Sequence, residues 1–167
     1  MMIRSAAVAL ASAVVLAAGV GVAVVSSQQP KTAAGKPSVA VFKSPTCGCC
    51  AKWNEHMTAA GYTITSRDMT DMNAVKDEHR VPSPLRSCHT ALVAGYVIEG
   101  HVPAAAIRKL LAERPHARGL AVPGMPVGSP GMEVEGQPAE RYAVVIFGPQ
   151  GQRIYVRFHG KELLPGN

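Results

Sequence analysis

Three of the four cysteines in this chain lie within four consecutive residues, as Cys47, Cys49 and Cys50. The fourth, Cys88, stands far along the chain. The thiolate form of cysteine is both a nucleophile and a soft metal ligand, so a cluster this tight is typical of soft-metal binding or redox chemistry. Cys47 and Cys50 also form a C-x-x-C pair that encloses Cys49. We therefore expect a scaffold that brings Cys88 to the first three cysteines.

Structural disulfides are a poor explanation for this spacing. A bridge between the neighbours Cys49 and Cys50 would close a strained ring, and Cys47–Cys49 spans a single residue. Only a Cys47–Cys50 disulfide could form without local strain, and the loop that it closes is too short to stabilise the fold much by chain entropy. The cysteines are therefore expected to act as metal ligands or redox groups.

Copper fits the predicted thiolates better than zinc does. Soft thiolates select Cu(I), zinc or iron–sulfur clusters, and the positive end of a helix dipole favours the thiolate form. Adjacent residues such as Cys49 and Cys50 point about 100° apart on a helix, which is awkward for one tetrahedral zinc ion. Thiolates that bridge several Cu(I) ions suit this geometry, and such a centre could also pass copper between Cu(I) and Cu(II).

Two other functions remain open from the residues alone. One is a thiol–disulfide oxidoreductase that uses Cys47 and Cys50, and the other is a structural module stabilised by zinc. If the protein is an enzyme, copper oxidoreductase is the expected class. The chain has no G-x-S-x-G elbow, no H-E-x-x-H pair and no phosphate-binding glycine loop, so hydrolase and nucleotide-binding chemistry of those kinds is not indicated.

Four further residues are secondary ligand candidates. His89 follows Cys88 directly, and is either a neighbour of the metal ligands or a core histidine. His101 precedes Pro103 in a loop, where it is either a ligand or part of the packing at a helix start. Met125 and Met132 carry thioethers, which bind Cu(I), although methionine also fills irregular gaps in packing.

The hydrophobic pattern predicts alternating strands and helices around these residues. Residues 91–98 are expected to form one interrupted strand or a tight hairpin. Residues 120–136 are expected to form a Pro/Gly/Met loop, and a loop of this length usually has a function or packs over another part of the protein. In chain order the other predicted elements are strand 39–42, helix 49–60 capped by Ser44 or Thr46, strand 62–65, helix 71–79, a helix from Pro103 to before Pro115, and strands 142–147 and 153–159.

This order, with a cysteine pair directly after the first strand, predicts an α/β fold of thioredoxin-like outline. A mixed central sheet would be flanked by helices and end in a β-hairpin, which Gly148–Gly151 would turn. In that architecture the chain just before the third strand packs against the start of the cysteine-bearing helix. Cys88 falls at this point, so the two groups of cysteines should meet.

The N-terminus has the pattern of an export signal, because a positive charge at Arg4 precedes an uncharged run over 5–25. Residues 1–27 are expected to be a signal peptide or an uncleaved membrane anchor, with cleavage after Ser27 or Ala34. Residues 28–37 would form a flexible leader, 38–160 the metal-binding domain and 161–167 a tail. The net charge of +6 comes from scattered basic residues, so no nucleic-acid partner is indicated.

Four motifs together resemble the CopG-type periplasmic copper-resistance proteins, a family long described only as a domain of unknown function. The resemblance covers about Val39 to His159. It implies a thioredoxin-like fold, copper held by the C-x-C-C cysteines with the later Cys88, and a role in copper handling outside the cytoplasm with other periplasmic copper-handling proteins. The motifs are Ser44-Pro-Thr-Cys-Gly-Cys-Cys50, Ser87-Cys-His-Thr90, Gly95-Tyr-Val-Ile-Glu-Gly-His-Val-Pro-Ala104 and Gly119-Leu-Ala-Val-Pro-Gly-Met-Pro126.

Overall fold

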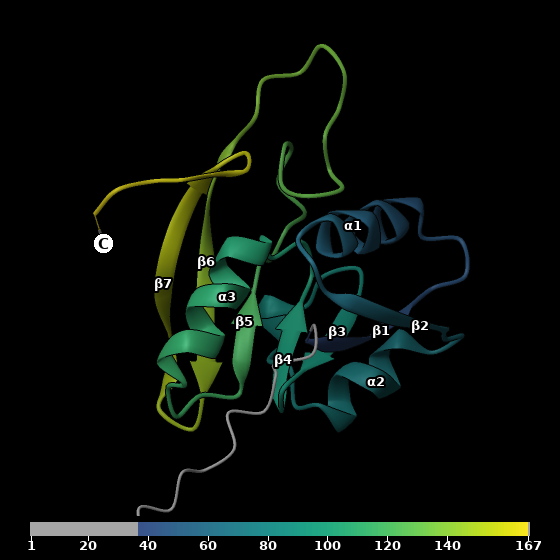
Figure 1. The fold of residues 1–167 in the computed structure, drawn as a ribbon. Coiled ribbons are helices and arrows are strands. Elements are labelled where there is room, and N and C mark those ends of the chain that lie inside the picture. Colours follow the sequence, from purple (N-terminus) through teal and green to yellow (C-terminus); the bar gives the residue numbers. More distant parts are fainter. Residues whose placement is uncertain (1–36, 167) are drawn as a thin grey trace, which may run out of the picture. The chain divides into compact units, whose positions relative to one another are not determined.

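Eight strands form one mixed sheet in a computed structural model that describes residues 37–166 (Figure 1). The expected signal peptide or anchor, and all of the leader but its last residue, lie outside the described residues. The strand order is β2-β1-β3-β4-β5-β6-β7-β8. The elements are β1 Ser38–Lys43, α1 Gly48–Ala59, β2 Thr63–Asp68, α2 Met72–Glu78, β3 Thr90–Val93, β4 Tyr96–Glu99, α3 Ala104–Glu113, β5 Gly119–Ala121, β6 Arg141–Gly148, β7 Gly151–His159 and β8 Glu162–Leu163.

The strand directions decide which loops meet. β1 runs parallel to β2 and antiparallel to β3, with Phe42 opposite Thr90. The end of β1 and the start of β3 therefore lie at the same edge of the sheet. The cysteine-bearing start of α1 follows β1, and the segment with Cys88 precedes β3, so strand pairing alone brings these two segments together.

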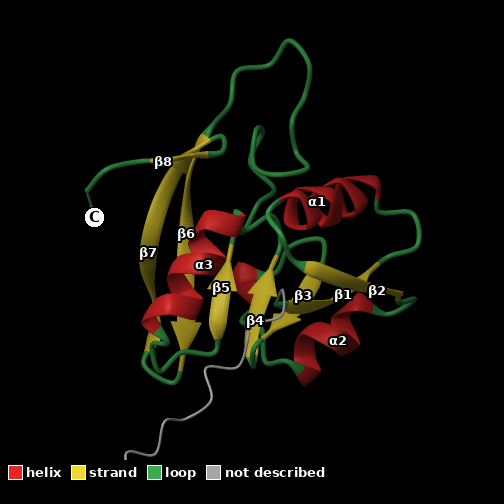
Figure 2. Ribbon diagram, viewed as in Figure 1, coloured by secondary structure: helices red, strands yellow, loops and turns green. Residues whose placement is uncertain are grey.

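Two hydrophobic clusters cover the two faces of the sheet. The larger packs α1 and α3 against the sheet through fully buried side chains such as Trp53, Met57 and Ile107. The smaller joins Val81 and Leu85 to the opposite face of β4, β5 and β6. Figures 1 and 2 show α1 and α2 on opposite sides of β1 and β2. The Trp53 indole also donates a hydrogen bond to the Val102 carbonyl at 2.9 Å.

Residues 91–98 belong to a hairpin rather than to one interrupted strand. Ala94 and Gly95 join β3 to β4, and both have positive φ, 46° and 86°. A two-residue turn of this kind matches the twist of the strands that it connects. The predicted C-terminal hairpin of β6 and β7 is confirmed.

Three details differ from the sequence-based expectations. Residues 119–121 form β5, which pairs with both β4 and β6, whereas the predicted loop already began at residue 120. Residues 162–163 pair with β7 as β8. Neither Ser44 nor Thr46 caps α1, because Cys47 occupies the N-cap position and makes no side-chain capping bond. Strands of two or three residues are too short to leave a periodic pattern.

The loop between β5 and β6 packs on the start of α1, as Figure 2 shows in green. A Cβ atom built on Gly131 would lie 2.6 Å from the Cys49 carbonyl oxygen and 2.8 Å from the backbone nitrogen of Trp53. The loop backbone thus touches the helix turn that carries the cysteines, and only glycine allows this approach. Among the helices of residues 37–166, none has both the length and the apolar character to cross a bilayer.

We predict that Gly131→Ala destabilises the fold more than Gly136→Ala does. Both residues have positive φ, 86° and 75°, so alanine suffers similar backbone strain at both positions. At Gly136 nothing lies within 4 Å of an added Cβ, whereas at Gly131 the loop must move away from α1. Overpacking typically costs about 1–3 kcal/mol. In thermal unfolding followed by circular dichroism, equal midpoints for the two variants would contradict this packing.

Candidate metal site

The sulfur atoms of all four cysteines meet at the start of α1. Cys47 is the N-cap residue of this helix, and Cys49 and Cys50 lie in its first turn. Cys88 comes from the segment that leads into β3. The four Sγ atoms lie within 4.8 Å of one another. This is the juxtaposition that the order of the elements predicted, and thiolates this close can share metal ions.

Cys47 and Cys50 are joined by a disulfide, with their Cα atoms 5.3 Å apart. Cys49 and Cys88 are free thiols, both half-buried. The Sγ atom of Cys49 lies 3.5 Å from that of Cys47. In this oxidised form only two of the four sulfurs can bind a metal as thiolates, so four-cysteine ligation requires the disulfide to be reduced first.

His101 presents a nitrogen lone pair to Cys88. Its Nδ1 atom lies 2.8 Å from the Pro130 carbonyl oxygen, which can only accept a hydrogen bond. The proton therefore sits on Nδ1, and Nε2 is the unprotonated nitrogen. Nε2 lies 2.9 Å from the Cys88 sulfur. A backbone carbonyl that holds one imidazole nitrogen while the other faces a ligand position is the usual arrangement at metal sites.

His89 is fully buried beside the same sulfur. Its Nδ1 atom lies 3.3 Å from Cys88 Sγ, and its Nε2 atom has no hydrogen-bond partner among residues 37–166. The ring packs against Trp53 with centroids 4.6 Å apart, and the His101 ring lies nearly perpendicular to it with centroids 5.1 Å apart. Burial, with smaller contributions from His101 and Lys76, holds the pKa of His89 well below its ordinary value. The ring is thus neutral, which is the form that binds metals.

The Cys88 thiol keeps its proton in the metal-free protein. Burial, followed by the charge and hydrogen bond of Cys49, raises the pKa of Cys88 to about 12. Burial lowers the pKa of His101, so the pair consists of a neutral thiol and a neutral imidazole. The thiol S–H donates to Nε2 of His101. A metal ion that bound both atoms would take the place of this proton, so binding must release it.

A buried ion pair holds the segment that carries Cys88. The Glu99 carboxylate is fully buried and accepts a bond of 2.6 Å from the Lys76 ammonium, which is 4% exposed. The same carboxylate accepts bonds from the Ser87 amide at 2.6 Å and the Thr90 hydroxyl at 2.7 Å. Ser87 and Thr90 flank Cys88 and His89, so Glu99 fixes both ends of the segment.

A close backbone contact completes this support. The Gly100 amide donates to the His89 carbonyl at 2.9 Å. A Cβ atom on Gly100 would lie 2.5 Å from the Ser87 hydroxyl and 2.7 Å from the Val122 carbonyl oxygen. Glycine at this point lets the Cys88 segment approach the chain next to His101. The sequence analysis did not identify Lys76, Glu99 or the Pro130 carbonyl as part of the site. The available signal was Glu99 itself, a charged residue at the end of the apolar run 96–98.

The two methionine candidates lie in the loop that packs on α1. Met132 is half-buried and directly follows Gly131, whereas Met125 is 43% exposed with a φ of 48°. Ligation of Cu(I) by either methionine stays a prediction.

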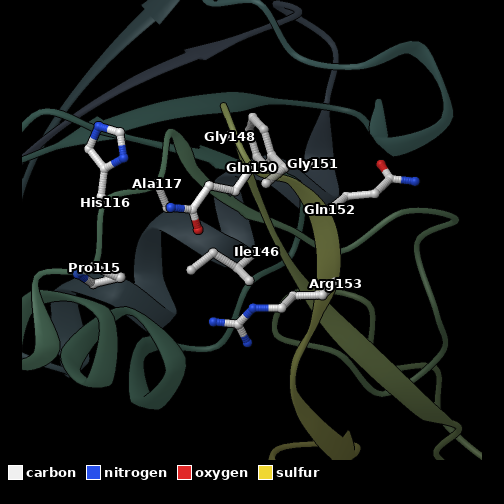
Figure 3. Close-up of a pocket in the computed structure, with 10 residues that line it drawn as sticks. Pro115, His116, Ala117, Ile146, Gly148, Gln150, Gly151, Gln152 and Arg153 are labelled. Carbon is white, nitrogen blue, oxygen red and sulfur yellow. The ribbon is translucent and has the colours of Figure 1, made fainter.

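A separate cavity of about 220 Å³ lies between residues 115–117 and the tip of the β6–β7 hairpin (Figure 3). Its lining includes His116, Gln150 and Arg153 and contains no cysteine. Gly119 pairs with Phe147 near this cavity, whereas Ala121 pairs with Glu99 toward the cysteines. The cavity is therefore at the opposite end of the sheet and takes no part in the metal site.

We predict that Glu99→Gln costs the oxidised, metal-free protein about 3–5 kcal/mol in the free energy of unfolding, because it leaves the buried Lys76 charge unpaired. The matched control is Asp77→Asn, which breaks the ion pair of Arg86 with a carboxylate that is 68% exposed. That change should cost at most about 1 kcal/mol. Urea denaturation measures both values, and similar small losses would show that the buried pair is dispensable.

We predict that Cys88 reacts slowly with iodoacetamide at pH 8 while the disulfide is intact. Raising the pKa of this thiol from 9.0 to about 12 lowers its thiolate fraction roughly 1000-fold. Mass spectrometry of the peptide with Cys88 should show labelling at least ~100-fold slower than in denaturant. A rate close to that of the unfolded chain would mean that the thiol is ionised in the fold.

The comparisons with known families and solved structures agree with one another. A family described as protein of unknown function DUF411 matches residues 85–132. No curated protein matches the chain. Among solved structures, copper resistance protein CopG in its form 2 is 42% identical, with a TM-score of 0.69, and the alignment covers 74% of this chain and 98% of that one. Form 1 has the same identity and TM-score and covers 75% and 100%.

The resemblance that the four sequence motifs indicated is thereby confirmed over nearly the full length of the solved relatives. The chain belongs to the CopG family of copper-resistance proteins.

Proposed function

We propose that this protein binds several Cu(I) ions as a thiolate cluster and acts in copper resistance and homeostasis. The observation that carries the proposal is the meeting of four sulfur atoms within 4.8 Å. Thiolates suit Cu(I), and four of them at this spacing can bridge several ions. The ligands would be Cys47, Cys49, Cys50 and Cys88.

The frame that we propose for this centre is thioredoxin-like. Its support is the sequence β1-α1-β2 with parallel strands, followed after α2 by the antiparallel hairpin of β3 and β4 and by α3. The cysteine pair stands at the start of α1, directly after β1. In such a frame the Cys47–Cys50 disulfide takes up two electrons and two protons from an external thiol reductant, and the two thiols then lose their protons to bind copper.

The histidines give the site a second kind of donor. Ligand atoms of Cys88, His89 and His101 lie within 4.8 Å of one another, so Cys88 belongs to both a sulfur set and a nitrogen-containing set. Imidazole nitrogen suits copper in either oxidation state. We propose that copper passes between Cu(I) and Cu(II) here, each ion exchanging one electron with an external redox partner, which would make the protein a copper oxidoreductase.

The proposed place of action is the periplasm. The charged and then apolar N-terminus has the pattern of an export signal or anchor. Other periplasmic copper-handling proteins would then be the partners that deliver or accept copper. The membrane would be involved only if the N-terminal segment is retained.

A thiol–disulfide oxidoreductase is the second candidate function, and the Cys47–Cys50 disulfide favours it. The free Cys49 thiol lies 3.5 Å from Cys47, close enough to exchange with the disulfide. This contact makes a clean two-cysteine cycle harder, which is why copper binding is the preferred function.

We predict that the fully reduced protein takes up more than one Cu(I) per chain under argon and that all four thiols become protected. Copper content, thiol counting and the ultraviolet absorption of thiolate-bound Cu(I) measure this together. The test variant is Cys88→Ser, which should bind fewer copper ions per chain because it lacks the thiolate shared by both donor sets.

Two outcomes would contradict the proposal in different ways. One tightly held zinc per chain with no preference for copper would identify a structural zinc module. No held metal, with a Cys47–Cys50 disulfide that cycles with a dithiol substrate, would identify a thiol oxidoreductase.

A further inference from the structure

The oxidised form leaves a second, smaller set of metal ligands intact. Its disulfide occupies Cys47 and Cys50, while Cys49 and Cys88 remain free. The two free sulfurs lie within 4.8 Å of each other, and both residues are half-buried.

We propose that the disulfide-bonded protein binds a single Cu(I) ion between Cys49 and Cys88, with His101 beside it as a nitrogen donor. The chain would thus have two copper capacities, set by the oxidation state of the Cys47–Cys50 pair. This inference rests on the proposed copper binding and adds a state in which half of the cysteines are unavailable.

One ion can reach both free sulfurs. A thiolate bonds a first-row metal such as zinc at about 2.3 Å, so two thiolates on one ion can stand up to about 4.6 Å apart. The two sulfurs lie within 4.8 Å of each other, so both are within reach of a single ion. Zinc seeks four donors in a tetrahedron, and this pair falls short of that set.

His101 is prepared to complete the coordination. The Pro130 carbonyl keeps the proton on Nδ1, and Nε2 directs its lone pair at the Cys88 sulfur from 2.9 Å. The segment that carries Cys88 is held at Ser87 and Thr90 by the buried Glu99 carboxylate. These supports do not involve the disulfide, so they persist in the oxidised protein.

The binding step is balanced without any redox partner. Cu(I) forms two bonds to sulfur, two thiol protons pass to solvent, and the copper remains Cu(I). The Cys47–Cys50 bond is neither formed nor broken. Reduction of that bond would then add two thiolates next to the bound copper ion, and these could bind further copper ions.

The test titrates the oxidised protein with the acetonitrile complex of Cu(I) under argon, without any thiol or phosphine reductant. A chromophoric Cu(I) chelator serves as competitor. We expect one copper per chain, with Cys49 and Cys88 both protected from a thiol reagent that labels them in the metal-free protein on long incubation, and with the disulfide still present by mass spectrometry. The reduced protein, titrated in parallel, should take up more than one.

Variants separate the new site from the larger one. Cys49→Ser should abolish copper uptake by the oxidised form. The double variant with Cys47→Ser and Cys50→Ser keeps only the proposed ligands and, with its two thiols reduced and under argon, should bind one copper per chain. His101→Ala should weaken the retention of copper against the chelator at least ~10-fold. His116→Ala, at the opposite end of the sheet, is the matched histidine control. The midpoint of thermal unfolding shows whether each variant is folded.

The outcomes distinguish this inference from the proposed function. Several coppers on the reduced protein and none on the oxidised protein would overturn the inference and leave the proposed cluster standing. One copper on both forms would support the inference and contradict the cluster. Copper on neither form would overturn both.

Discussion

The buried Glu99 carboxylate is the constraint on which the site depends. It lies at the end of β4 with no exposed surface, and a charge in that position is tolerated only because Lys76 and two further donors satisfy it. Two of those donors, Ser87 and Thr90, bracket the segment that carries Cys88. The energetic requirement to pair one buried charge therefore ties α2, β4 and the Cys88 segment into one unit and fixes the fourth sulfur relative to α1.

The site itself joins two donor sets that share one atom. Cys88 meets the C-x-C-C sulfurs on one side and two neutral imidazoles on the other. In the metal-free protein a proton lies between Cys88 and His101, held there by the raised pKa of the thiol and by the Pro130 carbonyl that fixes the imidazole tautomer. The proposed binding of metal by all four cysteines would therefore require both ionisation of the thiols and reduction of the disulfide.

The remaining parts of the fold serve this edge. The loop between β5 and β6 reaches across to α1, supplies the carbonyl that orients His101, and touches the cysteine-bearing turn through Gly131. The C-terminal strands extend the sheet on the far side and anchor both ends of that loop. The copper that we propose as the cargo would be bound at this edge, where the sulfur and imidazole donors have the chemistry to hold it.

The sequence by itself determined which cysteines are available for chemistry and the order of the main elements. The apolar run over 39–42 and the helical pattern that follows the cysteines are local signals, and the strand and the helix that they predicted are confirmed. Only the tertiary structure decided what surrounds Cys88: the contact with His101, the His89 nitrogen that has no hydrogen-bond partner among residues 37–166, and the Glu99 carboxylate that holds the segment. The short strands β5 and β8 were also beyond prediction. These features arise from contacts between residues far apart in the chain, and burial and hydrogen bonding across such distances leave no periodic trace in the sequence.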